Sequence, residues 1–222
     1  MPRMSEEHLE RRRRQILDAA RACFIRNGVH ATSMQDIFAE AGLSAGAVYR
    51  YFKSKTDIIE AITGTVIGDL HVFLAELVEH DPVLPLDEMV VRMTERVVKL
   101  SGPEGPMRLA PQAWALAMYD ADLRHYVQQN VAGLRGHWIE YMRRCVAAGL
   151  LPADTDTEAA GKAIFGILPG FLLQRLIVED ITPEQLRTGV RTLIRSSLIT
   201  PDATTPAATA PAATAPGATT GS

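Results

Sequence analysis

The stretch Thr32–Lys55, TSMQDIFAEAGLSAGAVYRYFKSK, decides the fold that we expect for this chain. It predicts two short helices joined at Ala41-Gly42-Leu43, because glycine adopts a left-handed turn conformation at little cost. Thr32 and Gln35 stand three residues apart and predict a capping box at the start of the first helix. Ser44 is expected to cap the second helix. Two short helices across a glycine turn are typical of a helix-turn-helix, whose second helix enters the major groove of DNA.

The second of these helices, which should end near Tyr51, divides into a buried and an exposed face. Val48 and Phe52 share a face with Leu43, so we expect these three to be core anchors. Arg50 on the other face is long enough to read guanine in bidentate fashion, and small residues near the helix start can touch a thymine methyl. The residues that we predict to contact DNA are Thr32, Ser33, Ser44, Ala45, Gly46, Ala47, Tyr49, Arg50, Tyr51 and Lys55.

Several of these predicted contacts are to the phosphate backbone. Lys55, with the free N–H groups of the helix that it begins, is expected to form a phosphate clamp. Thr32 and Ser33 are expected to do the same at the start of the preceding helix. The run Arg11–Arg14 could hold the backbone, or reach a minor groove from a flexible arm.

The charge distribution supports this interpretation. Residues 1–55 carry ten Lys and Arg against six acidic residues, whereas residues 56–222 carry 13 basic against 20 acidic residues. A basic end on an acidic body can attract phosphate with one face. A capped helix before a glycine turn also occurs in proteins that bind no DNA, and an arginine run is usually only a solvated surface. Together, in one N-terminal unit, these features favour DNA binding.

Composition excludes several other classes of protein. The chain of 222 residues is 47% apolar and has two cysteines, so a disulfide framework is not expected. The start has no apolar run typical of a secretory signal, and we find no uninterrupted stretch of about 18 apolar residues. We therefore expect a cytoplasmic protein. The histidines and cysteines show no metal-ligand spacing, and no metal or cofactor is predicted. Cys145 could be a redox sensor, but we expect a buried inert thiol.

Helical periodicity extends through the rest of the chain and predicts an all-α fold. We expect an N-terminal three-helix unit over residues 1–54, a helical body over 55–200, and a disordered tail of Ala, Thr, Pro and Gly over 201–222. The expected helices cover residues 7–26, 32–41, 44–51, 55–79, 87–100, 106–117, 121–131, 134–148, 157–178 and 183–199.

Residues 11–60 resemble the DNA-binding domain of the TetR (tetracycline-repressor-like) family. The resemblance implies about nine helices, a homodimer, and repression that ends when a small molecule binds in the body. The remaining chain is similar to that family only in its length and helical pattern. The residues that carry the resemblance are Ile16-Leu-Asp-Ala-Ala20, Phe24, Asn27-Gly28, Thr32-Ser33, Asp36-Ile37, Ala41-Gly-Leu-Ser44, Gly46, Val48-Tyr49, Tyr51-Phe52, Lys53 and Lys55.

The body is rich in large flexible apolar residues, which can line an adaptable cavity or fill a helical core. The resemblance favours a cavity, and the scarcity of charge there predicts a largely apolar ligand. The expected ligand-binding residues are Met89, Met93, Met107, Trp114, Met118, Trp138, Tyr141 and Phe165. Gln112, Gln174 and Arg175 are possible polar anchors.

The segment Thr157–Val178 is the best candidate for the dimer interface, although it could also be an intrachain core helix. Small residues let one side approach a partner helix closely, and Pro169 should kink the helix. The expected interface residues are Gly161, Gly166, Gly170 and Leu173.

The sequence therefore predicts a homodimeric transcriptional repressor that binds a palindromic DNA operator and is released by a small apolar effector. An all-helical enzyme, or a helical protein-interaction module with a structural N-terminal cap, is the alternative. We find no zinc His-Glu-x-x-His, no Gly-x-Ser-x-Gly and no phosphate-binding glycine loop, so catalysis is not expected.

Overall fold

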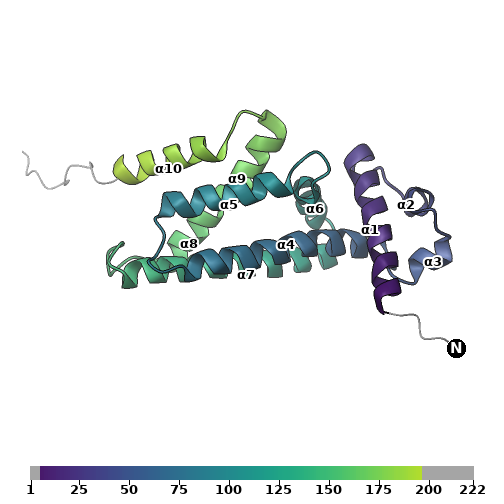
Figure 1. Ribbon diagram of the computed structural model, residues 1–222, viewed down its shortest axis with the longest axis horizontal. Coiled ribbons are helices and arrows are strands. Elements are labelled where there is room, and N and C mark those ends of the chain that lie inside the picture. Colours follow the sequence, from purple (N-terminus) through teal and green to yellow (C-terminus); the bar gives the residue numbers. More distant parts are fainter. Residues whose placement is uncertain (1–5, 197–222) are drawn as a thin grey trace, which may run out of the picture.

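The computed structural model describes residues 6–196, and it contains only helices, turns and loops over that range. It confirms the all-α fold, with a helix-turn-helix unit at one end of an elongated helical body (Figure 1). The tail predicted over 201–222 and the last residues of the final predicted helix lie outside the described residues.

Three helices form the N-terminal unit, which we call the head: α1 (Glu6–Asn27), α2 (Met34–Ala41) and α3 (Ala45–Tyr49). α1 ends where Gly28 takes a positive φ of 82°. The capping box of α2 is formed by Ser33 and Asp36, one residue later than the predicted Thr32–Gln35 pair. The side-chain oxygen of Ser33 accepts from the amide of Asp36 at 3.2 Å, whereas Thr32 is 1% exposed and lies in the core.

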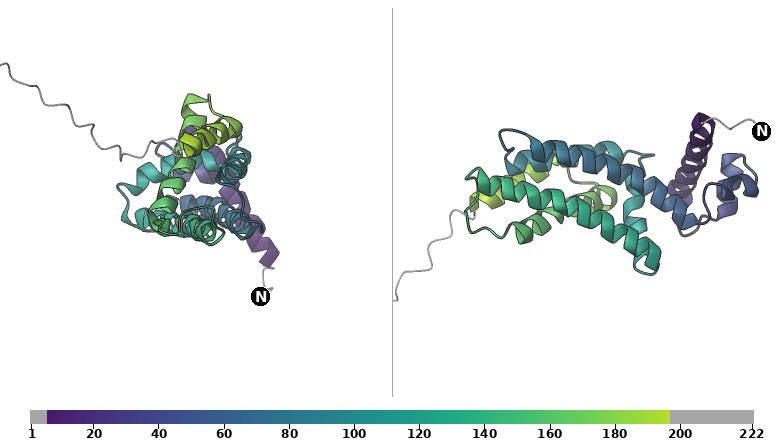
Figure 2. Two further views of the ribbon diagram at one scale, coloured as in Figure 1. Left: turned by 90° about the vertical axis from the view of Figure 1, so that its left-hand side faces the viewer. Right: turned by 90° about the horizontal axis from the view of Figure 1, so that it is seen from below.

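The body consists of long helices that run along its length and shorter ones that cross or cover them. In Figures 1 and 2, α4, α5 and α7 lie lengthwise, and the head stands at the end opposite to the last described residues. The elements are α4 (Lys55–Glu79), α5 (Leu86–Leu100), the 3-10 turn η1 (Pro106–Leu109), α6 (Ala110–Ala117), α7 (Ala121–Ala147), α8 (Thr157–Phe165), α9 (Ile167–Leu173), the π-helical turn η2 (Gln174–Val178) and α10 (Pro183–Ser196).

Two predicted helix boundaries in the body are wrong. The two helices expected over 121–131 and 134–148 are one continuous helix, α7, and Gly133 within it leaves room for the His71 ring of α4. The single helix expected over 157–178, with a kink at Pro169, is interrupted as that proline predicts, but it is divided after Phe165 into separate helices. Pro169 accounts for the division, because its ring has no N–H and crowds the carbonyl four residues earlier, that of Phe165.

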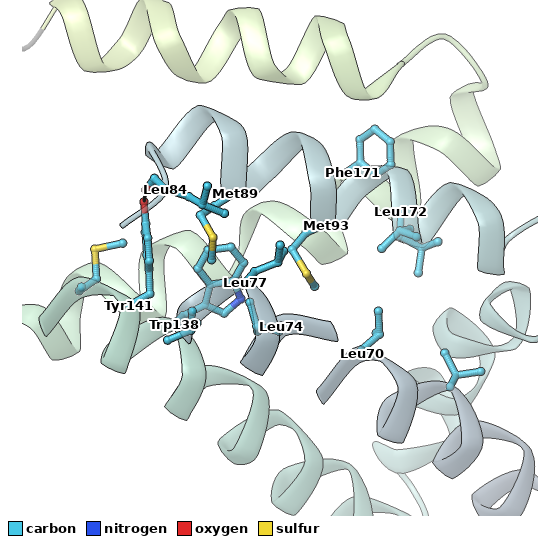
Figure 3. Packing of buried hydrophobic residues seen from close by; sticks show 14 of the residues in the cluster. Leu70, Leu74, Leu77, Leu84, Met89, Met93, Trp138, Tyr141, Phe171 and Leu172 are labelled. Atoms are coloured by element: carbon cyan, nitrogen blue, oxygen red, sulfur yellow. Dashed lines mark hydrogen bonds between the residues drawn. The ribbon is translucent and has the colours of Figure 1, made fainter. Parts of the chain in front are cut away.

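The apolar side chains form two clusters of buried residues. The body cluster fills the space between α4, α5, α7 and α9, with Trp138, Tyr141 and Met89 almost completely buried (Figure 3). The head cluster contains Ile16, Ile37 and Val48, and it also takes in Ala113 of α6. The core of the head is therefore shared with the body across the expected domain boundary at residue 54, which itself stays a prediction.

Charged side chains hold α10 against α5. Asp87, at the start of α5, accepts hydrogen bonds from Arg187 at 3.2 Å and from Arg191 at 2.5 Å. The hydrogen bond from Arg191, supported by Arg187, holds the pKa of the Asp87 carboxyl below its ordinary value. The ionised carboxylate therefore stabilises the folded state relative to the unfolded chain.

We expect Asp87→Asn to flatten the acid side of the stability profile. Because the folded pKa is lowered, the stabilisation is present above the unfolded pKa, near 4, and is lost as pH falls through the folded pKa. The free energy of unfolding of the native chain should fall by roughly 1 kcal/mol more than that of the variant between pH 6 and pH 3. Urea unfolding at both pH values measures this, with the exposed Asp154→Asn as control. Equal pH slopes in all three proteins would contradict the role of Asp87.

Candidate DNA interface and ligand cavity

The turn between α2 and α3 is fixed by backbone geometry and caps. Gly42 has a φ of 63°, and the Leu43 amide donates to the Phe38 carbonyl at 3.1 Å, which closes the end of α2. The Ser44 side chain accepts from the Ala47 amide at 3.3 Å and caps α3. These contacts set the angle between the two helices, as the sequence predicted for Gly42 and Ser44.

α3 separates its buried residues from an exposed face. Val48 and Phe52 are 0% and 4% exposed in the head core, and Leu43 packs beside them. Ala47 and Tyr51 are half-buried, so they are less accessible than predicted. We call the remaining exposed residues the reading face: Ser44, Ala45, Gly46, Tyr49 and Arg50.

Tyr49 is held in place from two sides. Its ring meets that of Phe38 edge to face, with the centroids 5.3 Å apart. The Lys53 ammonium donates to the Tyr49 carbonyl at 2.9 Å and so satisfies a carbonyl near the end of α3. The tyrosine is nevertheless 42% exposed, so its hydroxyl lies at the surface of α3.

Two residues predicted to bind phosphate are instead used inside the head. Thr32 is 1% exposed, and its hydroxyl donates to the Gly28 carbonyl at 2.8 Å. The Lys55 ammonium donates to the carbonyls of Val29 and Thr32, at 2.8 and 2.9 Å. Both side chains therefore fix the connection between α1 and α2. Ser33 is exposed, and its hydroxyl takes part in the capping box with Asp36.

The arginine run lies on α1 and not on a flexible arm. Arg13 packs over the Phe52 ring, with its guanidinium carbon 5.6 Å from the ring centroid. Arg12 donates to Gln15 at 2.9 Å, whereas Arg11 and Arg14 are exposed. The basic end of the chain is therefore a rigid helical surface beside α3.

A cavity of about 300 Å³ lies in the body. Its polar side chains are mostly satisfied within the chain: Thr63 donates to the Ile59 carbonyl, Tyr126 to the Glu60 carbonyl, and Asn130 to the Tyr126 carbonyl. No charged side chain of the described residues lines it. The lining residues are Thr63, Val66, Ile67, Leu70, Val97, Pro106, Met107, Ala110, Ala113, Trp114, Tyr126, Val127, Asn130, Val131, Leu134, Phe165, Leu168, Pro169 and Leu172.

The cavity collects three of the eight predicted ligand residues: Met107, Trp114 and Phe165. The others are placed elsewhere. Met89, Met93, Trp138 and Tyr141 are at most 1% exposed and fill the body core (Figure 3), while Met118 is 70% exposed on the outer surface. The sequence did not single out Thr63, Tyr126 or Asn130, because polar residues at helical spacing give no sign that they face a void.

Several buried polar groups of the body have structural partners, although Trp138 Nε1 and Arg144 Nη1 are buried without one among the described residues. The Tyr141 hydroxyl donates to the Leu84 carbonyl at 2.7 Å, and burial raises the pKa of this tyrosine. Burial also raises the pKa of the Cys145 thiol, which disfavours the reactive thiolate. His71 and His137 meet across α4 and α7 at 3.1 Å, and burial, with the nearby His137, lowers the pKa of His71. Within residues 6–196, no three metal-ligating side chains come together.

The residues predicted for a dimer interface are not equivalent. Gly161 is buried against α7, and a Cβ there would lie 2.7 Å from Ile139 Cγ1 and 2.8 Å from the Ile139 nitrogen. This glycine therefore serves packing within the chain. Gly170 has no neighbouring atom in the space a Cβ would fill, Gly166 meets only the preceding turn, and Leu173 is 39% exposed.

Two segments of the described chain, Lys55–Glu79 and Thr157–Val178, are long and apolar enough to cross a membrane by length and composition alone, although neither is an uninterrupted apolar stretch. The first is the central helix of the body, with 39% of its most apolar window buried; the second has only 17% buried. Core helices of soluble proteins commonly have this composition, so the observation is weak evidence for a membrane.

Two family models match the chain. Residues 16–62 match bacterial regulatory proteins of the tetR family, and residues 87–199 match the C-terminal domain of BetI-type transcriptional repressors.

Individual relatives agree with these matches. The transcriptional regulator AcrR of Shigella flexneri is 26% identical over 207 residues, which are 90% of this chain and 96% of that protein. TtgR of Pseudomonas putida is 24% identical over 81% of this chain and 87% of its own length. The crystal structure of the Bacillus subtilis regulator FadR in complex with stearoyl-CoA superposes with a TM-score of 0.67 at 21% identity, over 82% of this chain and 96% of that one.

Proposed function

Because the chain belongs to the tetR family of bacterial transcriptional regulators, we propose that it is a cytoplasmic homodimeric repressor that leaves a palindromic operator when a small apolar molecule fills its cavity. One observation carries the proposal: α4 begins directly behind the reading face and also walls the cavity, through Thr63, Val66 and Leu70. A change in the cavity can therefore alter the position of the head.

The reading face is suited to the major groove. Ala45 and Gly46 have no bulk that would hold α3 away from the bases, and Arg50 is the long side chain that can pair with guanine. Two copies related by a twofold axis would read two half-sites about 34 Å apart. Arg11 and Arg14 on α1 supply positive charge for the adjacent phosphates.

The cavity favours an uncharged ligand. A charged molecule would lose its hydration without finding a partner of opposite sign among the lining residues. In the described chain the Asn130 amide nitrogen is bonded, whereas its side-chain oxygen has no hydrogen-bond partner and can accept from a ligand. We therefore propose a neutral apolar molecule with one hydroxyl or N–H group. That the structurally similar FadR holds stearoyl-CoA supports a ligand role for this fold.

The exposed surface of α9 and η2 is proposed as the centre of the dimer interface. Leu173, Ile177 and Val178 are 39%, 74% and 58% exposed, next to the open side of Gly170. Burying these exposed apolar side chains against a twofold mate would stabilise the dimer.

Selection of bound DNA from random oligonucleotides tests the whole proposal. We expect a palindrome, bound with strong dependence on salt concentration by a protein that sediments as a dimer. Failure to enrich any sequence, or enrichment of sites without twofold symmetry, would contradict it.

We expect Arg50→Ala to change which sequences are selected. Loss of a bidentate contact should relax preference at one guanine per half-site, at a cost of about 1–3 kcal/mol in discrimination. Affinity for random DNA at low salt should change little. Repeating the selection with the variant measures the effect, and a uniform loss of affinity for all sequences would instead make Arg50 a phosphate contact.

A further inference from the structure

Helix α6 is the wall that separates the cavity from the head. Ala110 and Trp114 line the cavity, Ala117 belongs to the head core, and Ala113 belongs to both. The helix has only eight residues, so the two sites lie on opposite sides of the same short element. A molecule in the cavity that displaces α6 must therefore also displace the residues of the head core that pack against this helix.

Gln112 of α6 binds the head directly. Its side-chain oxygen accepts a hydrogen bond from the Val29 amide at 2.7 Å. Val29 is 1% exposed and lies in the connection between α1 and α2, directly after the left-handed Gly28. The carbonyl of Val29 accepts from Lys55 at the start of α4. Both polar backbone groups of Val29 are thus held by side chains of the elements that wall the cavity.

We propose that Gln112 is the positioning residue through which occupancy of the cavity changes the orientation of the head; this inference rests on the proposed function. A ligand against Trp114 and Ala110 shifts α6 and draws Gln112 away from Val29. A hydrogen bond of this kind is lost beyond about 3.5 Å, so a shift of roughly 1 Å is enough. The connection that leads into α2 and α3 then loses one of its two fixed points.

The Val29 amide donates to the Gln112 side chain, and Val29 is 1% exposed, so loss of this contact leaves a poorly hydrated donor. An occupied cavity and a correctly oriented head are therefore mutually unfavourable. Linkage requires the effect to be reciprocal: bound DNA must weaken ligand binding by the same factor as the ligand weakens DNA binding.

The coupling can be measured with a defined probe. We would use N-phenyl-1-naphthylamine, a neutral apolar fluorophore with one N–H group, and the DNA sequence selected by the native dimer. The dissociation constant for DNA is measured with and without saturating probe, and that for the probe with and without DNA. Gln112→Leu removes the acceptor and keeps a similar volume, Gln112→Glu keeps an acceptor oxygen, and the exposed Gln129→Leu is the control on α7.

In the native protein the probe should weaken DNA binding about tenfold, within the usual range of such couplings. In Gln112→Leu the contact is absent with or without probe. Its affinity for DNA should therefore already be about tenfold weaker than native, the factor should fall close to one, and its affinity for the probe should be equal to native or tighter. Gln112→Glu and Gln129→Leu should keep the native factor. An unchanged factor in Gln112→Leu would overturn the inference and leave the proposed function standing. A native protein that binds both partners without coupling would overturn the inference and also the proposed release of DNA by a ligand.

Failure of the native protein to bind either the selected DNA or the probe would instead overturn the proposed function, and this inference with it. Should Gln112→Leu fail to fold, as judged by circular dichroism, amide exchange of the native protein decides. The Val29 amide should exchange faster when the probe is bound, and unchanged protection would overturn the inference.

Discussion

Replacing Lys55 by Met will destabilise the protein and will not merely weaken its hold on DNA. Methionine keeps the apolar stem but removes the ammonium that donates to the Val29 and Thr32 carbonyls. Both residues are 1% exposed, so water cannot readily replace the lost donors. Removing a charged donor from buried acceptors should cost about 1.5–3 kcal/mol of the free energy of unfolding. Urea unfolding monitored by circular dichroism measures this cost in the absence of any DNA.

Lys53→Met is the matched control. The Lys53 ammonium donates to an exposed carbonyl, that of Tyr49, where water can take its place, so the loss of stability should stay below about 1 kcal/mol. A Lys55→Met protein of native stability, with DNA affinity that depends less steeply on salt, would restore Lys55 as a phosphate contact.

The different roles of Lys55 and Arg50 indicate which features of the head can be predicted from the sequence and which cannot. The pattern of small, apolar and polar residues over 41–52 predicts the turn, the caps and the buried face of α3, because those features depend on neighbours in the sequence. The partner of the Lys55 ammonium depends on the path of the chain between α1 and α2, more than 20 residues earlier. No local sequence pattern predicts that path of the chain.

The cavity was harder to predict than the helices around it. Helix α4 has the boundaries expected from its apolar stripe, yet Met89 and Met107 could not be told apart by periodicity. Met89 is closed off by Trp138 and its neighbours, whereas Met107 faces the void between α4, α6 and α7. The packing of whole helices decides which apolar residues border the cavity. The type of a single residue does not predict it.

Pro169 and Gly133 illustrate the same limit in the backbone. The proline signal was strong, and it does divide the segment after Phe165. Gly133 lies in the gap between the helices expected over 121–131 and 134–148, but α7 continues through it, and the His71 ring occupies the space that a Cβ would need. A glycine within a helix can mean either a stop or a close approach, and only the neighbouring helix distinguishes the two.

A carboxylate placed on the reading face should abolish DNA binding while leaving the fold intact. Gly46→Glu suits this purpose because Gly46 is exposed, has no atom within 4 Å of an added Cβ, and is the second residue of α3. An acidic side chain in the first turn of a helix is favourable, and loss of a glycine raises helix propensity, so stability should be equal or slightly higher. Against the phosphates of a groove, the same charge should reduce affinity at least about 100-fold, or roughly 2.7 kcal/mol.

Gly46→Gln separates charge from size in this experiment. Glutamine has the shape of glutamate without its charge. The loss of DNA affinity in Gly46→Gln therefore measures only the steric effect of a longer side chain that keeps α3 away from the groove. If charge dominates, the two variants should converge as salt is raised, because screening shortens the range of the repulsion. Equal losses at all salt concentrations would mean that close approach at Gly46 is the requirement. Native affinity in Gly46→Glu, measured by fluorescence anisotropy with selected DNA, would show that α3 does not face the DNA, because no other contact could offset a carboxylate at that position.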